Sequence, residues 1–432
     1  MEILNYPSDT AQKRIDTIIN RGIEFDEKAV VNVRNILDDV KKNGDSALIS
    51  YVNRFDSPDL KIESLKVSDD EFEHALKNID QQFTRSLERA AVQIESFHKK
   101  QVRKSWIDTE RPGTILGQIF NPVDGAGIYV PGGQGGSTPL VSSVLMCAIP
   151  AKIAGVRRIC MVTPPTKNGS VNPYMLAAAR MVGVDTIYKL GSAWAIAALA
   201  YGTETVPRCD VIAGPGNIYV TIAKKLVSGT VGIDMIAGPS EVLVIADKSA
   251  NPDYTAADLL SQAEHDPLAS AMLVTDSSET ALAVIQALEI QIENLTRKDT
   301  ARQSLENYGA IMLVSDIDAA IDLANIIAPE HLELHISQPF EYLGKIRNAG
   351  AVFMGSYTPE PTGDYIAGPN HVLPTAGTAR FSSALSVDNF IKKTSVIHYS
   401  QAAFNNEAED IIRLADIEGL DAHANSVRIR LK

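Results

Sequence analysis

The regular alternation of strand-like and helix-like segments between residues 137 and 236 most constrains the fold of this chain. Each apolar, β-rich stretch is followed by a turn and then by a longer segment with helical character. Repeated βα units of this length predict a parallel sheet covered by helices on both faces. The expected strands are 158–162, 185–190 and 210–213, and the expected helices are 140–154, 173–182, 193–201 and 217–226.

A second α/β series follows the first, and helices separate most of its strands. Residues 1 to about 105 instead have a helical, charged pattern, with apolar residues at three- and four-residue spacing in 29–51 and 69–100. Residues 117–131 are β-rich and end in a glycine cluster, Pro131 to Gly136. The strands of the second series are expected at 241–246, 271–275, 310–314, 332–336 and 351–354.

The last fifty residues differ from both series. A segment at 386–393 is followed by an expected helix at 405–415 and by a short β-like tail at 426–431. The fold class expected is therefore α/β. It has two Rossmann-like parallel-sheet domains, a helical N-terminal arm and a small C-terminal tail module.

The bulk composition excludes several classes of protein. With 45% hydrophobic and 22% charged residues among 432, the chain is typical of a soluble globular protein. Its net charge of −13 argues against nucleic acid as a partner, because phosphate binding needs a basic face. We expect no secretory signal and no membrane partner, since the N-terminus lacks a signal pattern and no apolar run is long enough. The three isolated cysteines favour a reduced, cytoplasmic protein with buried thiols.

Three glycine-containing turns could bind phosphate groups. They are 132–133, 191–192 and 214–217, and each lies where a strand gives way to a helix. Helix N-termini beyond the carboxyl ends of parallel strands offer free N–H groups to phosphate. No segment has the GxGxxG fingerprint, because 125–130 lacks the third glycine. The turns therefore indicate nucleotide binding in a non-standard mode, or they only make tight turns.

Gln262 and His265 are three residues apart in a segment that predicts a helix from about Pro252 to Asp266. Residues at this spacing share a helix face, where a metal ion could meet both side chains. A solvated helix face is the alternative. An amide is an unusual ligand for zinc, which prefers Cys, His and carboxylate groups, so spacing alone does not define a zinc site.

Further candidates for acid/base chemistry and metal binding lie near the C-terminus. Glu330 and His331 precede an expected strand and could bring two bases to one cleft; a surface Glu beside a packed His is the alternative. Asp364 lies in a Pro- and Gly-rich stretch, 358–369, where it could reach a metal or only stabilise a turn. His423 lies in the tail, shortly after Glu418. The remaining histidines are interpreted as structural or surface residues: His74, His98, His335, His371 and His398.

Taken together, these segments resemble the histidinol dehydrogenase family of NAD- and zinc-dependent enzymes. The resemblance runs in family order from about residue 115 to the C-terminus, and the helical N-terminal region is compatible with it. The matching segments are 129–133, 214–217, 237–241, 262–266, 329–333, 363–365, 368–374 and 422–423.

The resemblance implies roles for individual residues and a homodimer with shared active sites. One Zn²⁺ per subunit is expected, with His423 supplied by the partner subunit through an exchanged tail. Glu330 and His331 match the acid/base pair, and Tyr129 and Asn217 match NAD⁺-binding positions. The expected zinc ligands are Gln262, His265, Asp364 and His423. The expected substrate contacts are Ser240, Gln262, His265, His331, Asp364, Glu418 and His423.

One position departs from the family pattern. The family has Gln at a position that contacts NAD⁺, whereas this chain has Trp194 in the segment 191–194. An indole cannot reproduce the paired donor and acceptor of an amide, so a contact between Trp194 and NAD⁺ is in question. A Trp could instead stack on the cofactor or cap the site.

The resemblance also implies a domain division and a reaction. L-histidinol would be oxidised in two steps to L-histidine, with His331 as general base and Glu330 activating water. Three alternatives are a dehydrogenase for another small polar alcohol, a catalytically silent binding module, and a zinc hydrolase that needs no cofactor. The expected division is an arm at 1–24, a discontinuous zinc-carrying domain at 25–128 and 238–382, an NAD-side domain at 129–237 and the exchanged tail at 383–432.

Overall fold

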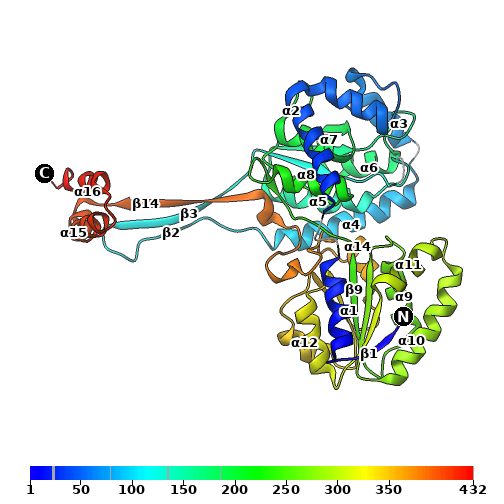
Figure 1. The fold of residues 1–432 in the computed structure, drawn as a ribbon. Coiled ribbons are helices and arrows are strands. Elements are labelled where there is room, and N and C mark those ends of the chain that lie inside the picture. The colour runs from blue at the N-terminus through cyan, green and yellow to red at the C-terminus, as the bar shows by residue number, and fades with distance from the viewer. Residues whose placement is uncertain (22–24, 78, 134–135, 185, 432) are drawn as a thin grey trace. The chain divides into compact units, whose positions relative to one another are not determined.

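The structure is a computed structural model that describes residues 1–21, 25–77, 79–133, 136–184 and 186–431 (Figure 1). Contacts divide the chain into two compact units. The first unit is Met1–Gln101 with Asp124–Phe390, and the second is Val102–Val123 with Ile391–Lys432. Gln134 and Gly135 of the expected glycine cluster lie outside the described residues, as do Asp185, Lys432 and the domain boundary expected at residue 24.

The first unit contains a five-stranded sheet in which every neighbouring pair of strands is parallel, which confirms the predicted parallel architecture. Its order is β6-β5-β4-β7-β8, so the chain starts in the middle of the sheet, builds outward on one side and then changes direction between β4 and β7. Ligands of open parallel sheets bind at such a switch point. The strands are β4 (Gly125–Tyr129), β5 (Arg158–Thr163), β6 (Thr186–Lys189), β7 (Val211–Ala213) and β8 (Gly232–Ile233).

The helices that accompany the five-stranded sheet come from two parts of the chain. Four follow the strands as predicted: α5 (Val141–Ala154), α6 (Pro173–Val182), α7 (Ser192–Tyr201) and α8 (Ile218–Val227). Three come from the N-terminal region: α2 (Glu27–Phe55), α3 (Asp69–Lys77) and α4 (Gln81–Lys99), with a short 3₁₀ helix η1 (Ile62–Ser64).

Helix α2 packs with the helices of the five-stranded sheet. Val33, Leu37 and Val52 of α2 share one apolar core with α7 and with β5. The cause is the sequence of α7, in which every residue from 193 to 200 is buried. A helix that is apolar on all sides must be covered by protein, and α2 supplies the cover.

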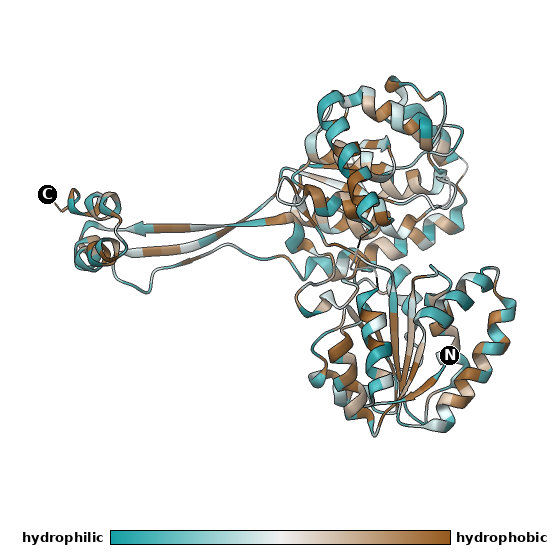
Figure 2. Ribbon diagram, viewed as in Figure 1, coloured by the Kyte–Doolittle hydropathy of each residue, from teal (hydrophilic) through white to brown (hydrophobic). Residues whose placement is uncertain are grey.

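The first unit also contains a six-stranded parallel sheet of order β1-β11-β10-β9-β12-β13. Its strands follow the second predicted series, and their residues are largely hydrophobic (Figure 2). Edge strand β1 was not predicted, because three residues give too short a pattern to recognise. The strands are β1 (Ile3–Asn5), β9 (Glu241–Ala246), β10 (Ser270–Thr275), β11 (Ala310–Leu313), β12 (His331–His335) and β13 (Ala351–Met354).

The helices that accompany the six-stranded sheet include α1 from the N-terminal arm. Ile15 and Ile18 of α1 pack in a core with β9 and β12. The α-helices are α1 (Asp9–Asn20), α9 (Pro252–Ala263), α10 (Ser278–Gln291), α11 (Lys298–Tyr308), α12 (Ile317–Ile327), α13 (Pro339–Tyr342) and α14 (Glu360–Tyr365). The 3₁₀ helices are η3 (Ile292–Asn294), η4 (Leu343–Lys345), η5 (Thr378–Arg380) and η6 (Val387–Phe390).

The second unit is a three-stranded antiparallel sheet with two helices. β14 (Ile391–Tyr399) pairs along its whole length with β3 (Thr114–Pro122), which also pairs with β2 (Trp106–Asp108). The predicted helix at 405–415 lies within α15 (Gln401–Ile417). The β-like tail predicted at 426–431 is wrong, because α16 (Asp421–Arg428) extends into it. Val427, Ile429 and Leu431 alternate as in a strand, but Ala424 and Val427 are buried at helical spacing.

Within the described residues no helix is both long enough and apolar enough to cross a membrane. All three cysteines are buried, as the composition predicted, and none of them forms a disulfide bond.

Candidate active site

The predicted acid/base residues lie where β12 begins, between β9 and the edge strand β13 of the six-stranded sheet. Glu330 immediately precedes the strand and His331 is its first residue, as predicted to within one position. The neighbouring strand β9 starts with Glu241, and the parallel register places His331 opposite Val242. Ser240, a predicted substrate contact, directly precedes β9. The amino ends of two adjacent strands therefore place Glu330, His331 and Ser240 in one region.

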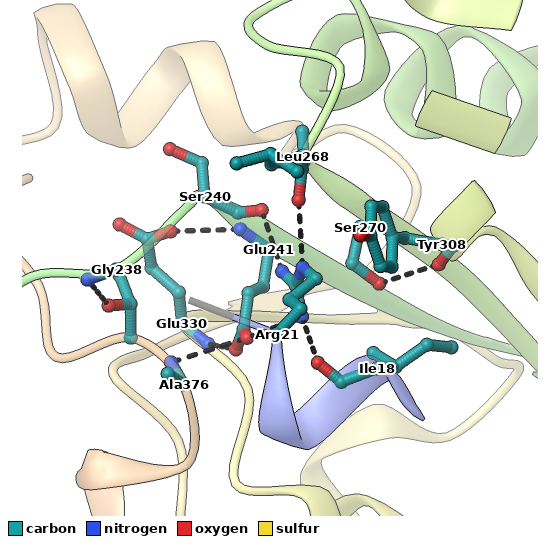
Figure 3. A network of polar contacts seen from close by, with 12 residues as sticks. Ile18, Arg21, Gly238, Ser240, Glu241, Leu268, Ser270, Tyr308, Glu330 and Ala376 are labelled. Atoms are coloured by element: carbon teal, nitrogen blue, oxygen red, sulfur yellow. Dashed lines mark hydrogen bonds and ion pairs between the residues drawn. The ribbon is translucent and has the colours of Figure 1, made fainter. Parts of the chain in front are cut away.

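Glu330 is held by a buried network that the sequence did not predict (Figure 3). Its Oε2 accepts the backbone N–H of Glu241 at 2.9 Å. The Glu241 carboxylate pairs with Arg21 at 3.0 Å and accepts the backbone N–H groups of Glu330 and Ala376. Arg21 follows α1 and also donates to the carbonyl oxygen of Ser240. The two strand ends are thus tied together by charge-assisted hydrogen bonds.

The environment of Glu330 favours its protonated form. Burial raises the pKa of Glu330 well above its usual range, and the negative charges of Glu241, Glu360 and Asp364 raise it further. Taking a carboxylate out of water disfavours the ionised state, so Glu330 can accept and hold a proton at neutral pH. Functional sites often contain carboxyl groups tuned in this way.

His331 is oriented as a base. Its Nδ1 lies 2.9 Å from the carbonyl oxygen of Glu241, which can only accept a hydrogen bond, so the proton of the neutral ring is on Nδ1. Burial lowers the pKa of His331 and keeps the ring neutral. Nε2 therefore presents a lone pair, and it lies 3.7 Å from Oε1 of Glu360. A neutral imidazole fixed in this tautomer can accept a proton from a bound hydroxyl group.

Asp364 lies in a cluster with His331 and Glu360, and their ligand atoms are all within 4.8 Å of one another. Glu360 and Asp364 are four residues apart on α14, so they share a face of this helix. Asp364 was predicted in an irregular loop, and the helix corrects that prediction: Pro361 suits a helix start and did not break one. Burial, and secondly the charge of Glu360, raises the pKa of Asp364 to about 7.

Gln262 lies near the end of α9. This helix is shorter than the one predicted from the sequence: it ends at Ala263, with Glu264 as its cap, so His265 lies beyond it. The His265 N–H still donates to the Gln262 carbonyl at 3.2 Å, which keeps the two residues in one turn. Pro267 and the Asp266 side chain, which accepts the N–H of Leu268, stop the helix early.

The surroundings of Gln262 fit a metal ligand. Its side chain is fully buried, yet neither amide atom has a hydrogen-bond partner among the described residues. A buried amide without partners is destabilising, and a bound ion would satisfy its oxygen. The neighbouring Ser261 donates to Oε2 of Glu360 at 3.2 Å. Burial raises the pKa of Glu360, and the nearby His265 partly offsets this rise. These contacts join the end of α9 to α14, the helix that carries Asp364.

The other two expected site residues belong to the second unit. Glu418 caps α15 and His423 lies on α16, and both side chains are exposed. Joining them to Gln262, His265 and Asp364 remains a proposal. Glu360 is the cluster member that sequence reasoning missed, although its four-residue spacing from Asp364 was a signal that could have found it.

The expected NAD⁺-binding residues lie at the switch point of the five-stranded sheet. Tyr129 ends β4 and Asn217 caps α8 after β7, and β4 and β7 are neighbours. The Tyr129 hydroxyl accepts the N–H of Ser192 at 3.2 Å. Gly214 has a φ of 122°, and a Cβ there would be 2.1 Å from the carbonyl oxygen of Tyr129. The close approach of these two segments therefore requires glycine.

Trp194 lies in the core beside this edge. Its side chain is 5% exposed, and the rings of Tyr51 and Phe55 stack on it with centroids at 5.7 and 5.5 Å. Burial to this degree leaves the indole little surface to offer to a cofactor. Its N–H faces the carboxylate of Asp56 without making a hydrogen bond of normal geometry.

Asp56 is another residue that the sequence did not single out, and its titration gives a testable prediction. Burial raises the pKa of Asp56 to about 7. The folded protein thus binds this proton more tightly than the unfolded chain, so stability is lost as the pH rises from about 4 to about 7. Asp56→Asn should therefore raise Tm at pH 8, by roughly 2–4 °C per kcal/mol relieved. At pH 4 its Tm should match that of the wild type. Equal shifts at both pH values would contradict the assignment.

Comparison with known proteins agrees with this geometry. The family model described as "Histidinol dehydrogenase" matches residues 19–431. A histidinol dehydrogenase of Desulfotalea psychrophila is 53% identical over 425 residues, 98% of each chain, and one of Carboxydothermus hydrogenoformans is 56% identical over 412 residues, covering 95% of this chain and 96% of that one. The crystal structure of histidinol dehydrogenase from Elizabethkingia anophelis superposes with a TM-score of 0.93 at 38% identity, covering 100% of this chain and 98% of that one. This chain belongs to the histidinol dehydrogenase family.

Proposed function

We propose that this protein oxidises L-histidinol to L-histidine through a bound aldehyde, in two steps that each use one NAD⁺. One observation carries the proposal: the buried, neutral His331, with its free Nε2, lies beside Glu330 in a family member. The Oε2 atom of Glu330 is 3.8 Å from Nδ1 of His331. Oxidation of an alcohol needs one base for its hydroxyl proton, and oxidation of an aldehyde needs another to activate water.

In this proposal the two residues divide the proton transfers. His331 accepts the hydroxyl proton of the alcohol at Nε2. Glu330 then removes a proton from the water that adds to the aldehyde. Its raised pKa makes it a strong enough base when ionised and lets it retain the proton afterwards. NAD⁺, when bound, accepts the hydride of each oxidation, and Tyr129 and Asn217 are proposed to hold it.

The zinc ligands proposed are Gln262, His265 and Asp364, together with the partner subunit's His423. Imidazole and carboxylate donors suit a Zn²⁺ ion. An amide is an unusual zinc ligand, and the buried, unpartnered amide of Gln262 is the observation that supports its place in this set. Zn²⁺, when bound, would fix the pose of a substrate that carries amino and imidazole nitrogens. Ser240 and Glu418 are proposed as further substrate contacts.

The exchanged tail is supported by the surface of the second unit. Large hydrophobic side chains are exposed on its sheet and helices, and apolar side chains exposed in such number favour an interaction surface. They include Trp106 (50%), Ile397 (71%), Leu414 (64%) and Ile417 (78%). We propose that a second copy of the chain covers them in a homodimer. Three buried cysteines that form no disulfide support a reducing, cytoplasmic setting.

Mixing two inactive variants should test the shared site. His423→Ala and His265→Ala should each lose zinc and activity, because each removes one ligand from every site. In a mixed dimer, one site regains both histidines and the other lacks both. Random exchange of subunits should therefore restore about a quarter of wild-type activity and zinc. If His423 acted within its own subunit, mixing would restore nothing.

The activity itself is tested by incubating the zinc-loaded protein with L-histidinol and NAD⁺ and identifying the product. L-histidine and NADH are expected, and His331→Asn, which removes the base of the first step, should lower the rate about 10²–10⁴-fold. Consumption of substrate without NADH would indicate a hydrolase. Failure to consume L-histidinol, with turnover of another alcohol, would indicate a different dehydrogenase.

A further inference from the structure

Gly214, the first residue after β7, is held on both sides by one buried ion pair. Its backbone N–H donates to Oδ2 of Asp234 at 2.8 Å, and its carbonyl oxygen accepts from Nζ of Lys224 at 3.0 Å. Lys224 and Asp234 also pair with each other through Nζ and Oδ1. Lys224 lies on α8 and Asp234 directly follows β8, so three elements meet at this glycine.

The ion pair is buried and its geometry is fixed. The side chains of Lys224 and Asp234 are 4% and 0% exposed. Oδ1 of Asp234 also accepts the N–H of Met235 at 2.7 Å, which orients the carboxylate. A buried ion pair adds little stability compared with apolar residues of similar size, because both charges lose their hydration. Its charge-assisted hydrogen bonds are nevertheless short and strong, so the pair fixes the peptide groups that it binds.

The glycine held in this way begins the turn 214–217, which ends in the expected cofactor residue Asn217. The Asn217 side chain caps α8 by accepting the N–H groups of Tyr219 and Val220 at 3.1 and 3.2 Å. The first N–H groups of a helix have no partner within it, so those of Asn217 and Ile218 remain for a ligand. Ile218 is 47% exposed, which leaves the start of the helix open to that ligand.

The turn is packed closely on two sides. A Cβ on Gly214 would lie 2.1 Å from the carbonyl oxygen of Tyr129, and a Cβ on Gly216 would lie 2.3 Å from a methyl carbon of Val220. Closely packed interiors transmit strain, so a displacement of the ion pair passes directly to the turn. The position of the turn, and of the N–H groups that follow it, therefore depends on the pair.

Lys224 acts on the turn and not on a ligand. Its ammonium group is buried between the carboxylate of Asp234 and the carbonyl of Gly214, so its charge is already neutralised. The next residue, Lys225, is exposed, and its Nζ lies 4.8 Å from the centre of the Phe25 ring. The two lysines are adjacent on one helix, and the exposed one provides a matched control for the buried one.

We propose that Lys224 and Asp234 are positioning residues for the cofactor. By holding both backbone polar groups of Gly214, they keep the turn 214–217 in the position that binds NAD⁺. This inference rests on the proposed function, in which Tyr129 and Asn217 hold NAD⁺. The pair makes no contact with the substrate in this account and takes no part in the proton transfers.

Lys224→Met should weaken binding of NADH about 10–100-fold, the range for loss of one hydrogen bond between the turn and a charged diphosphate. Binding is measured by titrating the full-length protein with NADH and following the nicotinamide fluorescence, so the result does not depend on turnover. In the steady state, KM for NAD⁺ should rise while kcat changes far less. Lys225→Met should bind NADH as the wild type does. Zinc content should be unchanged in both variants, because the proposed zinc ligands lie on other elements.

A variant without either charge separates positioning from a purely structural role. Lys224→Met/Asp234→Asn leaves no unpaired charge in the core, so its Tm should recover relative to that of Lys224→Met. The Gly214 carbonyl still lacks its donor, so binding of NADH should remain weak. Asp234→Asn alone should also weaken binding, and it replaces Lys224→Met if that variant does not fold.

The outcomes distinguish failure of this inference from failure of the proposed function. Equal binding of NADH by Lys224→Met and Lys225→Met would overturn the positioning role and leave the proposed function intact. Recovery of binding together with Tm in the double variant would overturn it in the same way. A wild-type protein that binds no NADH would contradict the proposed function, and the positioning role would fail with it.

Discussion

Glu330→Gln is expected to slow oxidation of the aldehyde about 10²–10⁴-fold while changing oxidation of the alcohol far less. The amide keeps the shape of the side chain and can still accept the N–H of Glu241. It cannot take a proton from water, so the aldehyde would not be hydrated efficiently. The alcohol step depends on Nε2 of His331, whose orientation is set by the Glu241 carbonyl and not by Glu330.

The two steps are measured separately, with L-histidinol in a single turnover and with histidinaldehyde added directly. His331→Asn is the matched control, since it should slow the alcohol step more than Glu330→Gln does. Equal losses in both steps for Glu330→Gln would overturn the division of roles between the two residues.

Arg21→Met should destabilise the protein by about 3–5 kcal/mol, because it leaves the Glu241 carboxylate buried without its partner. The side chains of this pair are 2% and 7% exposed. Arg21 also donates to the carbonyl oxygens of Ile18 and Leu268, and these would lose their partner as well. The free energy of unfolding from urea titration measures the loss, provided that the slope of the titration is unchanged.

Two comparisons show whether loss of the Arg21–Glu241 charge pair causes the destabilisation. Arg21→Met/Glu241→Gln should recover part of the stability, since the unpaired charge is removed. Burial already raises the pKa of Glu241, and removal of Arg21 should raise it further. The deficit of Arg21→Met should therefore shrink as the pH falls and Glu241 takes up a proton. A deficit under 1 kcal/mol at neutral pH would contradict the network drawn in Figure 3.

The sheets were predictable from the sequence because buried parallel strands are short apolar runs with turns at both ends. Strands such as β9 and β10 are apolar at nearly every position, and their signal is local. The packing of α2 was not predictable in this way. Its apolar stripe requires a partner surface, but only the fold shows that the partner is α7, more than a hundred residues later.

The candidate site was predictable only where its residues give a local signal in the sequence. Glu330 and His331 stand out as adjacent polar groups before an apolar strand, whereas the zinc ligands were identified through a family resemblance. Arg21 and Glu241 gave no local signal, since they meet only when α1 packs beside β9.

The number of NADH molecules formed per L-histidinol consumed tests the central claim most directly. The claim is that one site, built around Glu330 and His331, removes four electrons from the substrate. The zinc-loaded protein, given limiting L-histidinol and excess NAD⁺, should form two NADH for each L-histidinol and release L-histidine. One NADH per L-histidinol, with the aldehyde as the released product, would contradict it.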